Sequence, residues 1–227
     1  SLTHGTVSCN YVDLLSKRLG PKGYTFINAG INGELSFNVL QRLDRVIQCN
    51  PDYVTILIGT NDSNWSATET NRREAVKEWN LRNQPSPEDY RRNLLEIISR
   101  LKSRTHAKIA LLSLPPITED MNHYRFKHSL KFNEIIREVA RKEHVAYLPL
   151  HETMRPIIEN HKSHPRFKFK DKEYIGYLAF VQHNLLGMSW DEISKWNGFL
   201  LLTDYLHLNC RSAGMICDLI EGFIIGG

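Results

Sequence analysis

Side chains that could carry out chemistry lie near the two ends of the chain and directly after one apolar segment. Among ten histidines, His207 is singled out by Asp204, three positions before it. This spacing lets both side chains point the same way from one turn, and a carboxylate that orients an imidazole prepares the ring to take a proton from a nucleophile. Asn61 follows the apolar run 53–58, which has the pattern of a strand buried on both faces. An amide held at a rigid strand end can stabilise negative charge that develops during a reaction.

Four short segments resemble, in the same order, the sequence blocks of the SGNH or GDSL hydrolase family. They are SLTHG at 1–5, NAGING at 28–33, GTND at 59–62 and DYLH at 204–207. Each is a weak signal alone, whereas the ordered set across nearly the whole chain is specific. The match departs from the family at Leu208, where a proline is common. The order serine, aspartate, histidine and the lack of a G-x-S-x-G elbow separate the chain from other serine hydrolases.

The resemblance implies a serine hydrolase that cleaves carboxylic esters, acyl or acetyl, through an acyl-enzyme. Ser1 would be the nucleophile, with Asp204 and His207 completing the catalytic triad. Gly33, aligned through the asparagine of its block, and Asn61 would donate the N–H groups of the oxyanion hole. The partner would be a small-molecule ester. No cofactor and no metal are expected, since no pair of histidines has convincing metal-ligand spacing.

The pocket walls would select the substrate, because the family hydrolyses many acyl groups from the same core. Asn64 and Trp65, just after the GTND segment, and Leu206, inside the DYLH segment, are the candidate substrate-binding residues. Trp79 and the aromatic-rich segment 174–202 are further candidates for pocket walls. Packing in the core is the competing explanation for each of these aromatic side chains.

Two alternatives compete with this interpretation. Ser1 could act through its own amine, as in N-terminal-nucleophile hydrolases, but those enzymes have sandwiched antiparallel sheets and this chain predicts a parallel one. The chain could also be a catalytically silent module of the SGNH fold that binds carbohydrate or protein. The presence of all four functional positions, Ser1, Gly33, Asn61 and His207, favours the enzyme.

The elements that would position these residues alternate between helix and strand, which predicts an α/β fold with a parallel sheet and helices on both faces. The resemblance implies the same architecture, a three-layer, flavodoxin-like sandwich. Helices are predicted at 7–19, 36–48, 87–101, 126–143 and 211–225, and strands at 24–28, 53–58, 108–114 and 145–148. Ser86 and Pro87 mark the start of the third helix. Residues 63–86 are predicted to be irregular, and 151–202 to form a helical, aromatic-rich insertion before the Asp204 motif.

The 227 residues suffice for one domain, so we expect a single SGNH hydrolase domain over 1–227. In the family, the first strand lies centrally in the sheet and presents the serine at its C-terminal end. We therefore expect that strand to precede Ser1, or another segment to take its place. Either a cytoplasmic or an exported protein is compatible with these patterns.

Composition narrows the classes of function. The net charge of +4 is small, and the basic stretch Lys162–Lys172 lacks a nucleic-acid motif, so no nucleic-acid partner is predicted. No run of about 18 apolar residues occurs, so no transmembrane helix is predicted. The four cysteines are widely scattered and are expected to be free, mostly buried thiols: Cys9, Cys49, Cys210 and Cys217.

Overall fold

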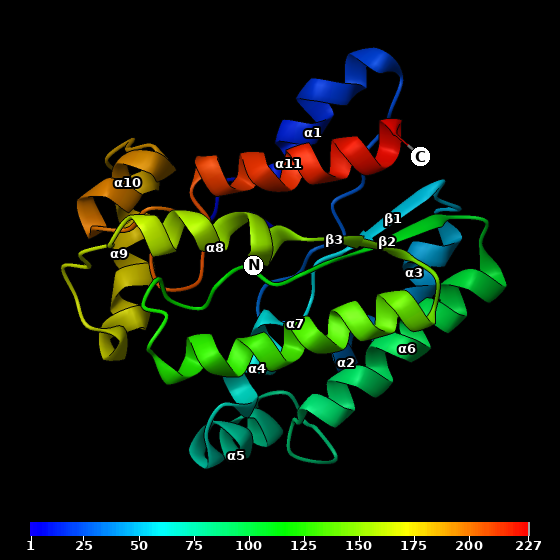
Figure 1. The fold of residues 1–227 in the computed structure, drawn as a ribbon, viewed down its shortest axis with the longest axis horizontal. Coiled ribbons are helices and arrows are strands. Elements are labelled where there is room, and N and C mark those ends of the chain that lie inside the picture. The colour runs from blue at the N-terminus through cyan, green and yellow to red at the C-terminus, as the bar shows by residue number, and fades with distance from the viewer. Residues whose placement is uncertain (227) are drawn as a thin grey trace. The chain divides into compact units, whose positions relative to one another are not determined.

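Three apolar runs form a parallel sheet in the computed structural model (Figure 1). The strands are β1 (Tyr53–Ile56), β2 (Lys108–Leu112) and β3 (Ala146–Leu148), in the order β1-β2-β3. Val54 pairs with Ile109, and Ala110 pairs with Ala146. Every β2 residue after the first is buried, so both faces of the strand are covered, as a continuous apolar run predicts. The parallel sheet and its flanking helices confirm the predicted α/β class.

The structure describes residues 1–226, which divide into two compact units. The helical unit combines Ser1–Asn32, Pro116–His123 and the chain from Leu150 onward, and the sheet unit combines Gly33–Pro115 and Tyr124–Pro149. Each unit therefore draws on separated stretches of sequence. A single domain over 1–227 stays a prediction, and Gly227 lies outside the described residues.

Two long helices of the sheet unit carry much of its apolar core. α6 (Pro87–Arg104) begins where predicted, because the Ser86 hydroxyl oxygen accepts the N–H of Asp89 at 3.1 Å. α7 (Tyr124–Lys142) packs against α6. The rings of Tyr90 and Phe132, one from each helix, meet in the core with their centroids 5.1 Å apart.

The predicted helix over 36–48 is two shorter helices, α2 (Ser36–Gln41) and α3 (Leu43–Gln48). Arg42 lies between them with φ −109° and ψ 11°, outside the helical conformation. Its guanidinium donates to both oxygens of the Glu34 carboxylate, and the shortest of these N–O distances is 2.6 Å. This largely buried ion pair ties Arg42, between the two helices, to the turn before α2.

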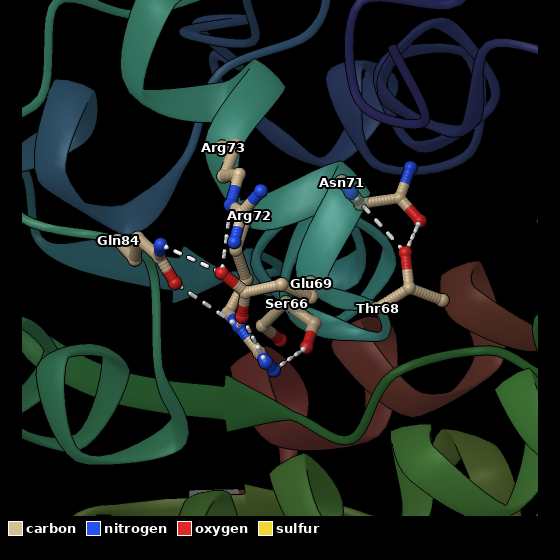
Figure 2. A network of polar contacts seen from close by, with 7 residues as sticks. All are labelled: Ser66, Thr68, Glu69, Asn71, Arg72, Arg73 and Gln84. Atoms are coloured by element: carbon tan, nitrogen blue, oxygen red, sulfur yellow. Dashed lines mark hydrogen bonds and ion pairs between the residues drawn. The ribbon is translucent and has the colours of Figure 1, made fainter.

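The prediction that residues 63–86 are irregular is wrong, because they include most of α4 (Thr60–Ser66) and all of α5 (Glu69–Glu78). Figure 2 shows the polar contacts at their junction: Arg72 donates to the Ser66 carbonyl at 3.2 Å and to the Glu69 carboxylate at 2.7 Å. Gln84 also donates to Glu69, and these bonds, that from Arg72 first, lower the pKa of Glu69 to about 2. Local polar contacts thus stabilise helices that lack an apolar pattern in sequence.

Residues 24–28 of the helical unit do not form the predicted strand. They are mostly exposed, and the Ile27 side chain is 64% exposed. A strand needs neighbours that pair its backbone N–H and C=O groups, and within residues 1–226 no such ladder includes this segment. Asn28 fixes its end instead: the side-chain N–H donates to the Thr3 carbonyl at 2.7 Å, and the side-chain oxygen accepts the N–H of Gly30 at 2.9 Å.

The helical unit contains α1 (Tyr11–Leu19), η1 (Gly20–Lys22), α8 (Leu150–Asn160), η2 (Phe169–Asp171), α9 (Lys172–Asn184), α10 (Trp190–Asn197) and α11 (Cys210–Ile225). α1 begins later than predicted because the Asn10 side chain caps it, accepting the N–H of Val12 at 3.0 Å. α1 packs along α11 (Figure 1), where Arg18 pairs with Asp218 at 2.6 Å. α8 to α10 lie in the predicted helical insertion over 151–202, except that α8 begins one residue earlier, at Leu150. Over residues 1–226, none of the helices has the length and apolarity needed to span a bilayer.

One pair of cysteines corrects the expectation of four free thiols. Cys9 and Cys210, 201 positions apart, form a disulfide within the helical unit. Cys49 and Cys217 keep their thiols, the first exposed and the second buried. Cys9 lies just before α1 and Cys210 opens α11, so the packing of these two helices brings the cysteines together. Sequence spacing does not show that contact.

Candidate active site

Asp204 and His207 lie in a tight hairpin of the helical unit. Leu202 and Leu208 form an antiparallel bridge, and the N–H of Thr203 donates to the carbonyl of His207 at 2.8 Å. The chain therefore pairs with itself on either side of the DYLH segment, and this segment forms the tip of the hairpin. Three residues of separation place both functional side chains on that one turn, as the sequence predicts.

The Asp204 carboxylate organises the tip. Its Oδ1 accepts the backbone N–H of Leu206 at 2.6 Å and that of His207 at 2.8 Å, and its Oδ2 lies 2.7 Å from the His207 Nδ1. Burial to 3% exposure by itself raises the pKa of Asp204, but the charge of His207 and these hydrogen bonds outweigh burial and lower the pKa below its usual value. The ionised carboxylate accepts the Nδ1 proton, which leaves Nε2 of the ring as the proton acceptor.

Ser1 meets the other side of the same ring. Its Oγ lies 3.0 Å from the His207 Nε2, within the range in which a base can take a hydroxyl proton. The Ser1 carbonyl accepts the N–H of Gly5 at 2.8 Å, which closes a turn directly after the serine. The structure thus brings all three predicted triad residues together within the helical unit.

A run of contacts holds the segment after Ser1 beside the hairpin. The N–H of Cys9 donates to the Leu208 carbonyl at 3.0 Å, and the Ser8 hydroxyl oxygen accepts the N–H of Leu208 at 3.1 Å. Thr203 donates its hydroxyl proton to the Val7 carbonyl at 3.1 Å. The disulfide then joins the two segments covalently. Residues separated by almost the whole chain are therefore fixed side by side.

The two predicted oxyanion donors are neighbours within the sheet unit. The Asn61 Nδ2 donates to the carbonyl of Glu34 at 3.0 Å, which ties the amide to the turn that contains Gly33. Gly33 has φ +78°, a conformation that favours glycine, and a β-carbon there would lie within 2.8 Å of the Trp79 ring. The packing of Trp79 against Gly33 was not assigned from sequence, although Trp79 was a candidate pocket wall.

Asp62 also joins these two segments, through a buried carboxylate. The sequence alone assigns it no role. Its buried carboxylate accepts the Ser36 N–H, at 3.0 Å to Oδ2, and the Ser36 hydroxyl, at 2.5 Å to Oδ1. Burial raises the pKa of Asp62 to about 6, against the opposing effect of the Ser36 bonds. Asn61 and Asp62 together connect the start of α4 to the turn before α2. The position of Asp62 directly after Asn61 in the GTND segment is the sequence signal that could have indicated that it supports Asn61.

Comparison with protein families places most of the chain in one family. The model of the GDSL-like lipase/acylhydrolase family matches residues 1–167. The chain belongs to this family. It is accordingly a carboxylic ester hydrolase.

Solved structures show that this GDSL-like hydrolase shares its fold with other hydrolases, acetyl xylan esterases among them. An acetyl xylan esterase, AlAXEase, aligns over 94% of this chain and 90% of its own, with a TM-score of 0.63 and 19% identity. Axe2, an acetylxylan esterase from Geobacillus stearothermophilus, aligns over 95% and 78%, with a TM-score of 0.62 and 16% identity. LAE5, an α/β hydrolase from the metagenome of Lake Arreo, Spain, aligns over 93% and 79%, with a TM-score of 0.61 and 16% identity. No curated protein matches the GDSL-like hydrolase by sequence.

The predicted substrate-binding residues of the hydrolase have different surroundings. Asn64 is buried, and its side-chain oxygen and backbone carbonyl both accept from the Arg125 guanidinium, at 2.5 and 2.8 Å. These bonds engage the side-chain oxygen of Asn64, and its part in substrate binding stays a prediction. Trp65 is half-buried, and so is Leu206, which lies on the hairpin between the two triad residues. Of the three predicted substrate contacts, Leu206 is the one in the helical unit, between Asp204 and His207.

Proposed function

We propose that the GDSL-like hydrolase cleaves esters by a Ser1–His207–Asp204 acyl-enzyme mechanism. The observation that carries the proposal is the unbroken chain of contacts from Ser1 Oγ to His207 Nε2, 3.0 Å, and from His207 Nδ1 to Asp204 Oδ2, 2.7 Å. His207 takes the proton of Ser1 as Oγ bonds to the ester carbonyl carbon. It then gives that proton to the leaving alcohol as the ester C–O bond breaks. Water, deprotonated by the same ring, attacks the acyl-enzyme and releases the acid and Ser1.

The oxyanion of each tetrahedral intermediate is assigned to the Gly33 N–H and the Asn61 side chain. A primary amide carries two N–H donors, and one of those of Asn61 is used by the Glu34 carbonyl. The other is available to a developing oxyanion, and the first bond keeps the amide oriented. Preorganised donors of this kind contribute about 3 to 4 kcal/mol each to transition-state stabilisation.

The proposed substrates are esters with short acyl groups, with acetylated carbohydrate as the first candidate class. Two of the structurally similar proteins are acetyl xylan esterases. Catalytic mutants of one of them replace a serine, an aspartate and a histidine, and the last two are three positions apart. The same residue types and spacing occur here in Ser1, Asp204 and His207, which supports a common mechanism.

One experiment tests both the mechanism and the substrate class. It measures hydrolysis of p-nitrophenyl esters of graded acyl length, from acetate to laurate, and of acetylated xylo-oligosaccharide. The wild-type protein and Ser1→Ala are compared on each substrate. We expect hydrolysis to be fastest for acetate and to be lost in Ser1→Ala. Equal activity of the two proteins would contradict the mechanism, and a preference for long acyl chains would contradict the substrate class.

A further inference from the structure

The Glu119 carboxylate binds the hairpin that carries Asp204 and His207. Its Oε1 accepts three consecutive backbone N–H groups, from Leu200 at 3.0 Å, Leu201 at 2.7 Å and Leu202 at 3.0 Å, and its Oε2 also accepts from Leu200 at 2.9 Å. Glu119 is 5% exposed. These three N–H groups belong to the segment that leads directly into the hairpin, so one side chain fixes the entry to the triad turn.

The residue before Glu119 binds the other part of the same hairpin. The N–H of Thr118 donates to the carbonyl of Tyr205, at the tip, at 2.9 Å. Thr118 is buried and has φ +66°, a conformation that is rare for a β-branched residue and costs free energy. The surrounding structure must therefore hold residues 118–119 in place. The entry and the tip of the hairpin are bound by two adjacent residues.

We propose that Glu119 is a positioning residue for ester hydrolysis, an inference that rests on the proposed triad function. Its carboxylate acts through the hairpin backbone and keeps the His207 ring between Asp204 and Ser1. It touches neither the substrate nor the reacting atoms.

The energetics of burial favour this role over that of an incidental core residue. A carboxylate removed from water is costly unless hydrogen bonds compensate it. Burial raises the pKa of Glu119, whereas the bonds from the hairpin N–H groups and from Ser163 oppose that rise. Convergent backbone N–H groups form an anion-binding concavity. Removing the acceptor would take this partner from three N–H donors next to the triad, two of them buried, and would favour movement of the segment that carries them.

Displacement of the hairpin should reduce catalysis more than it reduces binding. A misplacement of about 1 Å at a catalytic group can lower a rate by about 100-fold. Glu119→Ala is therefore expected to lower kcat by about 100-fold while KM changes little. Glu119→Gln keeps one oxygen for the hairpin but sets an NH₂ group against the Leu200 N–H. Its kcat should fall between those of the wild type and Glu119→Ala.

Ser189→Ala is the matched control, because it removes the N-cap of α10 in the same unit without touching residues 118–119. For each variant we would measure kcat and KM on p-nitrophenyl acetate, the thermal midpoint, and the proton NMR signal of His207 Nδ1–H. We expect the two Glu119 variants to shift or broaden that signal and to lose kcat beyond the unfolded fraction. Ser189→Ala should keep the wild-type Nδ1–H signal and the wild-type kcat, at a stability similar to that of the Glu119 variants.

A kcat loss that only follows the unfolded fraction, with an unchanged Nδ1–H signal in Glu119→Gln, would overturn the proposal. If Glu119→Ala does not fold, Glu119→Gln and its NMR signal decide the question. Ser1→Ala is measured in parallel. Were wild type and Ser1→Ala equally active, the triad mechanism itself would fail, whereas an inactive Ser1→Ala beside fully active Glu119 variants would reject the role of Glu119 alone.

Discussion

At the scale of single residues, the chemistry depends on which atoms of each side chain are already engaged. Asp204 fixes the His207 ring through Nδ1, so Nε2 faces Ser1. Asn61 uses one N–H to hold the turn containing Gly33. In the proposed mechanism, one polar group of each side chain sets the orientation and a second group takes part in the reaction. The sequence motif predicts these residues, whereas the structure shows which of their polar groups are engaged in hydrogen bonds.

Asn61→Ala tests the oxyanion assignment. Loss of one preorganised donor is expected to lower kcat by about 10²- to 10³-fold with a smaller effect on KM, measured by steady-state hydrolysis of p-nitrophenyl acetate. Asn93→Ala serves as the control, since the Asn93 side chain also donates one bond in the sheet unit, to the Ser36 hydroxyl at 3.0 Å. Equal kcat losses in the two variants would argue against a donor role for Asn61.

Asp62 predicts a pH dependence of stability. Burial raises the pKa of Asp62 from 3.8 to about 6, so between about pH 4 and 6 the folded state keeps a proton that the unfolded state has lost. Its contribution to the free energy of unfolding should therefore fall as the pH rises through this window, by about 3 kcal/mol in total. Urea unfolding of wild type and Asp62→Asn across pH 4 to 7 measures this as the difference between the two proteins. A difference that stays constant or grows with pH would contradict the prediction.

At the scale of elements, the sequence predicts those helices and strands whose formation depends on residues close together in the chain. The start of α6 follows from the Ser86 cap, and the strands β1 to β3 follow from apolar runs. The strand at 24–28 failed because strand formation depends on a pairing partner that the segment's own composition cannot supply. The sequence does not predict α5, because polar side chains, Arg72 and Gln84, stabilise it through Glu69. Such contacts leave no periodic pattern of apolar residues.

The disulfide between Cys9 and Cys210 gives a prediction for the elements that it joins. Replacing both cysteines by serine should lower the free energy of unfolding by about 2 to 5 kcal/mol, because the bond closes a very long loop in the unfolded chain. Guanidinium unfolding without reductant measures the loss, and Cys49→Ser, at an exposed free thiol, is the control. Wild type in reductant should approach the double variant. Equal stability of all three proteins without reductant would contradict a covalent link.

At the scale of the whole molecule, the family match covers only part of the predicted site: Ser1, Gly33 and Asn61 lie inside it, whereas Asp204 and His207 lie beyond it. The family model ends at residue 167, before Asp204 and His207, and α9 and α10 lie in the interval. The hairpin nevertheless returns to Ser1, 206 positions away. Ordered motifs predicted that meeting of the chain ends. They could not predict residues 118–119, which carry no motif and act only through the backbone of the hairpin.

The proposed mechanism also predicts how the intact enzyme responds to chelation. Its proton transfers and charge stabilisation come from side chains and backbone N–H groups. Hydrolysis of p-nitrophenyl acetate should therefore be unchanged after dialysis against EDTA. Loss of activity that returns on addition of a divalent cation would contradict this expectation.

The proposed mechanism requires that the hydroxyl of Ser1 is the nucleophile and that His207 activates it. The most direct measurement is labelling with a fluorophosphonate, followed by peptide mapping by mass spectrometry. We expect one adduct, on Ser1, that is absent in Ser1→Ala and forms much more slowly in His207→Ala. An adduct on a different serine, or labelling of Ser1 at an undiminished rate in His207→Ala, would contradict it.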